Sequence, residues 1–304
     1  MVKNIPTPDD FYSSGKELFN FAWGVVAELL TTFDQAEYYG VDPSEVSEAY
    51  WKASTRSITT ALSVTQQGVE LLLKGKIAEI SPYILIADSP RNWPSPRGTS
   101  GVEFSDFRTI DAQDLIRTHD LFSDNPLSQE FVSRFNEMRE QRNKLMHSVG
   151  HNIEVSVSQV VDAILYMHKA LMPEETWPKV RLEFLNSSPS AELGGWEVAT
   201  NTVCHETALA MKHLKTKQIE KYFNIDSRRR EYFCPVCLDN AYRKIELEEK
   251  LARLTVKSSD ATELYCPVCD SNYDVVREDC GNDECLGNVI YTDGKFLTCL
   301  TCNS

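Results

Sequence analysis

The residues that could carry out chemistry lie in two groups, a short motif near the middle of the chain and eight cysteines near its end. The motif is Arg142, Asn143 and His147, within the segment Arg-Asn-Lys-Leu-Met-His. A histidine titrates near neutral pH and can act as a general acid or base. An arginine keeps its positive charge and can stabilise a phosphate group. These side chains are therefore the types that RNA cleavage by a 2′-hydroxyl requires when no metal ion takes part.

The motif lies near the end of a helix that we predict over residues 127–149. At about 100° per residue, Arg142 falls inside the apolar arc of this helix, where a guanidinium group is costly unless it is paired. Asn143 and His147 fall just past one edge of the arc. The arc itself consists of Phe131, Phe135, Met138, Leu145, Met146 and Val149.

A carboxylate is needed to hold Arg142, and Glu70 is our candidate for it. Alternatively, Glu70 pairs with Lys74, which lies four residues further along the same predicted helix. The whole motif also has a structural interpretation. In that interpretation a buried carboxylate clamps Arg142, and His147 only caps the helix end, where a cation suits the helix dipole.

Three segments of the chain resemble the HEPN superfamily, whose ribonuclease members carry an Arg and a His separated by a short spacer, often with Asn directly after the Arg. Residues 142–147 fit this motif, residues 67–74 resemble the long helix that precedes the motif helix, and residues 107–116 resemble the segment that leads into it. The resemblance covers about residues 11–175 and does not reach the C-terminal quarter.

The resemblance implies a metal-independent endoribonuclease that works as a homodimer on an RNA substrate, with its active site where two motifs meet. It implies catalytic roles for Arg142, Asn143 and His147, to which we add Glu70 as the residue that steadies Arg142. Such proteins often serve as toxins or as antiviral defence (abortive infection) effectors. The alternative is a non-catalytic dimerisation or binding module.

Composition sets the frame for these expectations. The chain has 304 residues, of which 42% are hydrophobic, which is enough for a substantial core. No basic segment followed by an apolar run opens the sequence, and the apolar run 18–27 is too short to cross a bilayer. We therefore expect a cytoplasmic protein without membrane association.

Eight of the nine cysteines follow residue 233 and form close pairs, which indicates metal binding rather than disulfides. We expect two structural zinc ions, each held by four thiolates, and no catalytic metal. Alternatively, Cys266 and Cys269 share an ion with Cys280 and Cys285. Cys204 stands apart and is expected to be a buried apolar residue. The first expected site is Cys234, Cys237, Cys266 and Cys269, and the second is Cys280, Cys285, Cys299 and Cys302.

The C-terminal segment 231–304 is acidic, with seven Lys and Arg against fourteen Asp and Glu, a net charge of −7. Such a segment repels phosphates, so we expect it to recruit a protein partner rather than nucleic acid. It is also polar, and metal binding should supply most of its folding free energy. The basic run from Lys212 to Arg230 is interpreted as a solvated helix face and linker, with contact to an RNA backbone as the alternative.

The elements that must position these residues are mostly helices. We expect a mainly α protein with a HEPN-like helical bundle in 1–175, a connector and linking helix in 176–230, and a double zinc-ribbon domain with short β hairpins in 231–304. Residues 89–105 are expected to form an exposed loop, and 174–200 to lack a helical pattern. Helices are expected over 10–33, 43–80, 111–121, 127–149, 155–171 and 202–223.

Overall fold

The computed structural model describes residues 1–95, 101–147, 155–241, 246–294 and 297–304. It is mainly α, with short strands confined to small sheets, as the sequence predicted. The chain forms two compact units: Met1–Val26 with Glu48–Leu171, and Ala27–Ser47 with Met172–Ser304. Within these described ranges, no helix combines the length and the apolar character that spanning a membrane requires.

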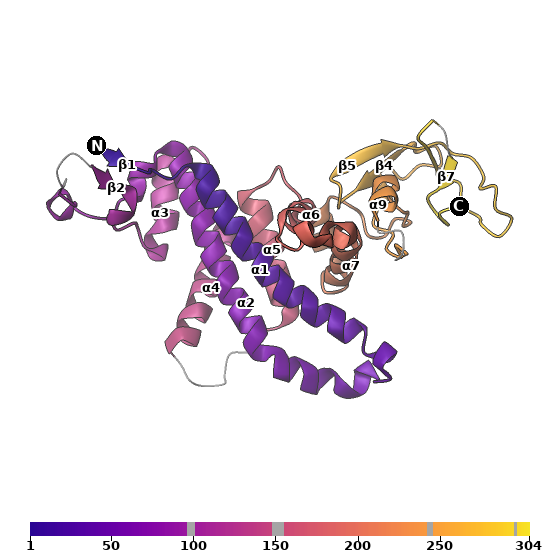
Figure 1. The fold of residues 1–304 in the computed structure, drawn as a ribbon, viewed down its shortest axis with the longest axis horizontal. Coiled ribbons are helices and arrows are strands. Elements are labelled where there is room, and N and C mark those ends of the chain that lie inside the picture. The colour runs from indigo at the N-terminus through magenta and orange to yellow at the C-terminus, as the bar shows by residue number, and fades with distance from the viewer. Residues whose placement is uncertain (96–100, 148–154, 242–245, 295–296) are drawn as a thin grey trace. The chain divides into compact units, whose positions relative to one another are not determined.

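Two long helices, α1 (Pro8–Asp34) and α2 (Pro43–Ile80), form a hairpin (Figure 1). Their parts within Met1–Val26 and Glu48–Leu171 provide the main framework of the first unit. Asp42 begins α2 as predicted, because its carboxylate accepts hydrogen bonds from the backbone and hydroxyl of Ser44. Glycines bring the two helices close together. A Cβ at Gly68 would lie 2.5 Å from Cδ1 of Phe19, and one at Gly15 would lie 2.7 Å from Cδ2 of Leu72.

Three further helices, α3 (Ala112–Phe122), α4 (Gln129–His147) and α5 (Val157–Leu171), complete the bundle of the first unit. The apolar face of α4 is buried as predicted at Phe131, Phe135 and Met138. A polar link joins α4 to α5, because Arg134 lies 2.5 Å from Asp162 and stacks on the ring of Tyr166.

The segment 89–105 is not simply an exposed loop. It includes β2 (Val102–Glu103), which pairs in parallel with β1 (Val2–Lys3), and it buries Val102 and Phe104. The described chain also includes short 3₁₀ helices at Glu37–Tyr39, Pro82–Leu85, Pro90–Asn92, Phe104–Asp106, Ala191–Leu193 and Gly195–Val198.

In the second unit the expectation of no helical pattern over 174–200 was wrong. A helix, α6 (Trp177–Ser187), lies there, with Pro178 in its first turn, where proline needs no backbone donor. The helix predicted over 202–223 is instead two helices, α7 (Ala199–Lys212) and α8 (Thr216–Phe223). Helices α6 and α7 pack together, and a buried ion pair at 2.9 Å joins Arg181 to Glu206 between them.

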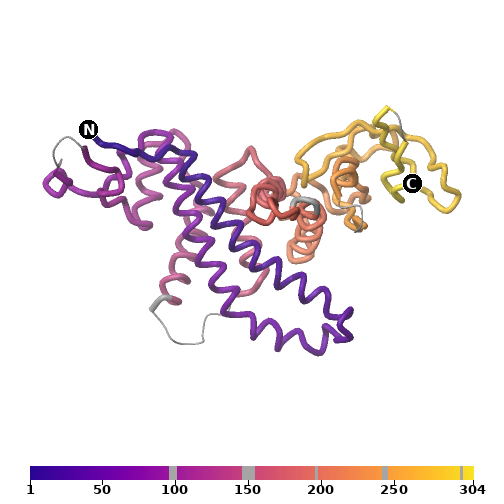
Figure 2. The backbone as a smooth tube through the Cα atoms, in the orientation of Figure 1, coloured from indigo at the N-terminus to yellow at the C-terminus, as the bar shows by residue number. Residues whose placement is uncertain are grey.

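The cysteine-rich end holds a short helix and two small antiparallel sheets. Figure 2 traces the backbone of this last part of the chain in orange and yellow. Contrary to expectation, this end shares an apolar core with α7. Buried members of this core include Val203, Cys204, Phe233, Leu264 and Leu300. The elements are α9 (Pro235–Asn240), the sheet of β3 (Arg253–Leu254), β4 (Glu263–Cys266) and β5 (Ser271–Asp274), and the sheet of β6 (Ile290–Thr292) and β7 (Leu297–Cys299).

Candidate metal centres and the Arg142 motif

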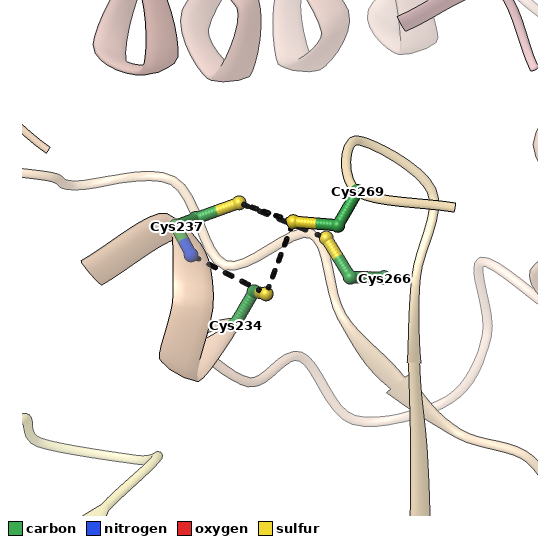
Figure 3. A group of neighbouring side chains, drawn as sticks. All are labelled: Cys234, Cys237, Cys266 and Cys269. Atoms are coloured by element: carbon green, nitrogen blue, oxygen red, sulfur yellow. Dashed lines mark hydrogen bonds between the residues drawn. The ribbon is translucent and has the colours of Figure 1, made fainter. Parts of the chain in front are cut away.

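Four cysteines from two segments point toward one another in the first cysteine group (Figure 3). Cys234 and Cys237 come from the start of α9, Cys266 ends β4, and Cys269 follows in the next turn. Cys234, Cys237 and Cys266 are buried. This is the first of the two groupings that the sequence left open for these residues.

The distances between the sulfur atoms fit a tetrahedral metal site. A metal–sulfur bond of about 2.3 Å in tetrahedral geometry places sulfur atoms roughly 3.8 Å apart. The sulfur of Cys237 lies 3.8 Å from that of Cys266 and 3.4 Å from that of Cys269, and Cys234 lies 3.7 Å from Cys269. Disulfides would require about 2.05 Å, so the four residues form a cluster of free thiols that could hold one ion.

The second group has the same character but lies nearer the surface. Cys280 and Cys302 bring their sulfur atoms to 3.7 Å, and Cys285 and Cys299 bring theirs to 3.9 Å. All four sulfur atoms lie within 4.8 Å of one another. Cys299, at the end of β7, is buried, whereas Cys302 is exposed. Each group thus offers four sulfur ligands, as a closed structural site requires.

In both groups, backbone N–H groups donate hydrogen bonds to sulfur atoms, and such bonds orient the ligands of a metal site. The backbone N–H of Cys237 donates to Cys234 at 3.5 Å, and the N–H of Gly287 donates to Cys285 at 3.3 Å. Burial and a hydrogen bond to Cys269 raise the pKa of Tyr273, so this hydroxyl keeps its proton and can donate to the sulfur.

The ninth cysteine, Cys204, is buried on α7 and is a member of the same core as the first site. Its side chain also contacts Cys237. The expectation of a buried apolar residue is confirmed for its burial. Its position beside the first cysteine group was not predicted from the sequence.

The Arg142 motif lies on α4, and the structure supplies its partner. The Nη1 atom of Arg142 lies 3.7 Å from Oε1 of Glu70, which comes from α2. Lys74, the other partner considered for Glu70, instead donates to the hydroxyl of Thr109 at 3.1 Å. Side-chain exposure is 31% for Arg142 and 20% for Glu70, so the pair is partly shielded from solvent.

A buried glutamine extends this ion pair. Gln66, one turn before Glu70 on α2, donates a hydrogen bond to the Glu70 carboxylate. Gln66 was not predicted from the sequence, although its spacing of four residues from Glu70 was a usable signal. Within the described ranges, Oε1 of Gln66 and Nε of Arg142 are buried without a hydrogen-bond partner.

The remaining motif residues lie at the C-terminal end of α4. Asn143 is exposed, and His147 is the last residue of the helix. The side chain of His147 lies outside the part of the chain that the structure describes. Asn143 and His147 are four residues apart within one helix, so their positions lie on one face. Arg142, Glu70 and Asn143 are thus brought to one region by α2 and α4.

The basic run that the sequence singled out is divided among several contacts. Lys212 pairs with Asp34 at 2.8 Å, and Arg228 pairs with Asp226 at 2.8 Å. Hydrogen bonds to Arg228 lower the pKa of Asp226 to about 2. The side chains of Lys212 and Arg228 nevertheless remain 62% and 74% exposed, which agrees with the interpretation as a solvated helix face and linker.

Comparison with protein-family models, with curated proteins and with solved structures finds no match to this chain. The HEPN resemblance therefore depends on the residues of the motif and of the two flanking segments.

Proposed function

We propose that this protein is a metal-independent endoribonuclease whose catalytic residues are Arg142, Asn143 and His147, with Glu70 as a positioning residue. The observation that carries the proposal is the ion pair between Arg142 and Glu70 at 3.7 Å. It supports the proposal because a guanidinium that is fixed by one carboxylate still has donors left for a phosphate. Exposed Asn143 lies beside it at the end of α4.

The reaction follows from the chemistry of RNA. The 2′-oxygen attacks the adjacent phosphorus and forms a new bond, a general base takes the 2′-hydroxyl proton, and the bond from phosphorus to the 5′-oxygen breaks. A general acid protonates the leaving 5′-oxygen. His147 supplies one of these proton transfers, and Arg142 stabilises the negative charge on the phosphate oxygens. The products are a 2′,3′-cyclic phosphate and a 5′-hydroxyl.

A homodimer would supply the second histidine. Each chain has one His147, whereas the reaction uses both a base and an acid. Exposure of Asn143 and partial exposure of Arg142 support a motif that borders an intermolecular surface. We propose that two copies bring their motifs together, as the resemblance implies, and that a defence or toxin role follows from such activity.

We further propose that both cysteine groups bind zinc. Four thiolates at these sulfur separations suit a tetrahedral ion, and zinc is the usual occupant of such sites. A site closed by four protein ligands leaves no position for water, so zinc stabilises the second unit and takes no part in cleavage. The segment 231–304 would then serve as a contact surface for a protein partner.

The proposal is tested with purified zinc-loaded protein and total RNA. Wild-type protein should cleave RNA, whereas His147→Ala and Arg142→Ala should lose the activity. Glu70→Gln should retain part of the activity, because Arg142 is still present and loses only the ion pair that positions it. Arg117→Ala, which removes an exposed arginine from α3, serves as the matched control and should cleave normally.

The competing function is a non-catalytic dimerisation or binding module. The same ion pair favours it, because Glu70 by itself explains why an arginine is tolerated in the apolar arc of α4. Full activity in both His147→Ala and Arg142→Ala, at equal dimer content, would exclude the proposed active site. Absence of cleavage in the wild type on any RNA tested would favour the binding module.

A further inference from the structure

The second unit contains a basic pocket in an otherwise acidic part of the protein. Its volume is about 530 Å³, within the range of small-ligand sites. Three segments form it: the turn after α8, the loop after β3, and the chain that follows β5. Their charged side chains are five cations, Arg228, Arg229, Arg230, Lys257 and Arg277, and one carboxylate, Asp226.

The single carboxylate is already engaged by two of these arginines. Asp226 accepts two hydrogen bonds from Arg228, at 2.8 Å and 3.0 Å, and lies 3.8 Å from Nε of Arg229. Arg229 also donates to the backbone carbonyl of Leu254 at 2.7 Å. Asp226 therefore orders one wall of the pocket and leaves a formal surplus of four positive charges, five cations less one carboxylate.

The other three cations have no carboxylate partner among the residues that the structure describes. Arg230 stacks on the ring of Tyr232 at 5.7 Å, and Lys257 is exposed. Arg277 donates one hydrogen bond to Asn288 at 2.9 Å, but its Nε and Nη1 atoms are buried without a partner in the described ranges. Arg230, Lys257 and Arg277 therefore line the pocket with positive charge that no carboxylate of the described residues neutralises, and an anionic ligand could do so.

The ligand that fits is a multiply charged oxyanion. A terminal phosphate carries up to two negative charges and has three acceptor oxygens, and guanidinium forks match its geometry. A single carboxylate would neutralise only one of the four surplus charges. The net charge of −7 in segment 231–304 makes a general attraction to polyanions unfavourable. Selection must therefore come from the pocket itself.

We propose that this pocket binds a terminal phosphate or polyphosphate group, as carried by a nucleotide or by the 5′ end of an RNA. The proposal is independent of the proposed function, because the pocket lies in the second unit and involves none of Arg142, Asn143, His147 and Glu70. It assigns recognition of a phosphate end, rather than of a continuous nucleic-acid backbone, to the residues that line this pocket.

Binding is measured by isothermal titration calorimetry on the full-length, zinc-loaded protein, with pyrophosphate, ATP and adenosine as probes. Pyrophosphate and ATP should bind, and adenosine should not. Arg277→Gln should weaken binding by roughly ten-fold or more, the effect expected for loss of a charge-assisted hydrogen bond. Lys217→Gln removes an exposed lysine of α8 outside the pocket and should leave the affinity unchanged.

Two short RNAs, with 5′-phosphate and with 5′-hydroxyl ends, distinguish the sources of the phosphate. Preference for the phosphorylated RNA supports an RNA end as the ligand, and binding of ATP without that preference supports a nucleotide. No binding of pyrophosphate or ATP at low salt would overturn the proposal, as would equal weakening by Lys217→Gln and Arg277→Gln. Lys257→Gln provides a second pocket variant if Arg277→Gln loses zinc or fails to fold.

Discussion

Among single residues, Gly287 bears most directly on the second cysteine group. A Cβ at this position would lie 2.6 Å from the hydroxyl oxygen of Thr301 and 2.9 Å from the sulfur of Cys299. The Gly287 backbone also donates to Cys285. An added methyl group would therefore push apart two segments that bring sulfur ligands together.

Gly287→Ala should accordingly lose one of two bound metal equivalents, measured by elemental analysis after gel filtration. Gly281→Ala is the matched control, because it lies in the same loop and a Cβ there would meet nothing within 4 Å. We expect Gly281→Ala to retain both metal ions. Two full equivalents in Gly287→Ala would show that the segment relaxes around the methyl group.

At the same scale, the sequence predicted the site residues unevenly. Arg142 was recognisable because a lone guanidinium in an apolar arc requires a carboxylate, and the structure places Glu70 beside it. The grouping of the cysteines was undecided, because spacing alone does not show which loops fold back on which. Gln66 was missed although it lies one helical turn before Glu70, because that spacing alone does not show that the amide is buried against the carboxylate.

Among the helices, the crossing of α1 and α2 depends on glycine. Alanine normally stabilises a helix interior by about 1 kcal/mol relative to glycine. At Gly68 the added Cβ would lie 2.5 Å from Cδ1 of Phe19, a buried residue of α1. Overpacking of this kind costs typically about 1–3 kcal/mol, so packing should outweigh helix propensity at this position.

Gly68→Ala should therefore lower the free energy of unfolding in chemical denaturation, despite its better helix propensity. Lys52→Ala, an exposed substitution on the same helix, should leave it nearly unchanged. A Gly68→Ala protein more stable than wild type would mean that α1 and α2 can move apart at no cost.

A hydrogen bond connects α7 to the segment before β3. Nδ1 of His205 lies 2.7 Å from Oε1 of Glu249. This hydrogen bond raises the pKa of His205 above 6.5, with burial acting in the opposite direction. Because the folded pKa is higher than the unfolded one, the stabilisation is fully present below pH 6.5 and is lost as pH rises through the folded value.

The melting temperature of zinc-loaded protein should thus contain a component that falls as pH is raised above about 6.5. This component should be absent from His205→Gln, which keeps a polar side chain without the titration. Identical pH profiles for the wild type and His205→Gln would show that the pair of His205 and Glu249 does not contribute to the pH dependence of stability.

Helix prediction succeeded where local signals were strong and failed where tertiary packing decides. Asp42 and Pro43 marked the start of α2 through capping and a fixed backbone angle. Helix α6, which packs on α7, was missed although Trp177, Val180 and Phe184 keep the helical spacing i, i+3 and i+7. The break between α7 and α8 lies near His213, where the sequence contains no glycine or proline, so the break could not be predicted from those residues.

For the molecule as a whole, the first cysteine group and the apolar core of the second unit share residues. Cys204 of α7 shares a core with Cys234, Cys237 and Cys266. Metal loss should therefore disturb α7 as well as the cysteine-rich end. The sequence did not predict this coupling, because the apolar residues involved are scattered from α7 to the C-terminus.

Cys204 provides a probe of the coupling. In metal-loaded protein its thiol should be unreactive toward a thiol reagent, because it is 2% exposed. After chelation it should react together with the metal ligands, giving nine reactive thiols in total, the number in the chain. Cys204→Ser should give one fewer. If Cys204 stays protected after complete metal removal, α7 folds independently of the metal centres.

We propose that the Arg142 motif cleaves RNA without a metal ion, and the ends of the cleavage products test this activity most directly. End-labelled RNA is incubated with purified protein in EDTA, within the time for which the fold persists, and the products are analysed. We predict 2′,3′-cyclic phosphate ends from wild type, none from Arg142→Ala, and no cleavage where the RNA is 2′-O-methylated. Products with 3′-hydroxyl ends, or cleavage that disappears in EDTA while the protein stays folded, would contradict the claim.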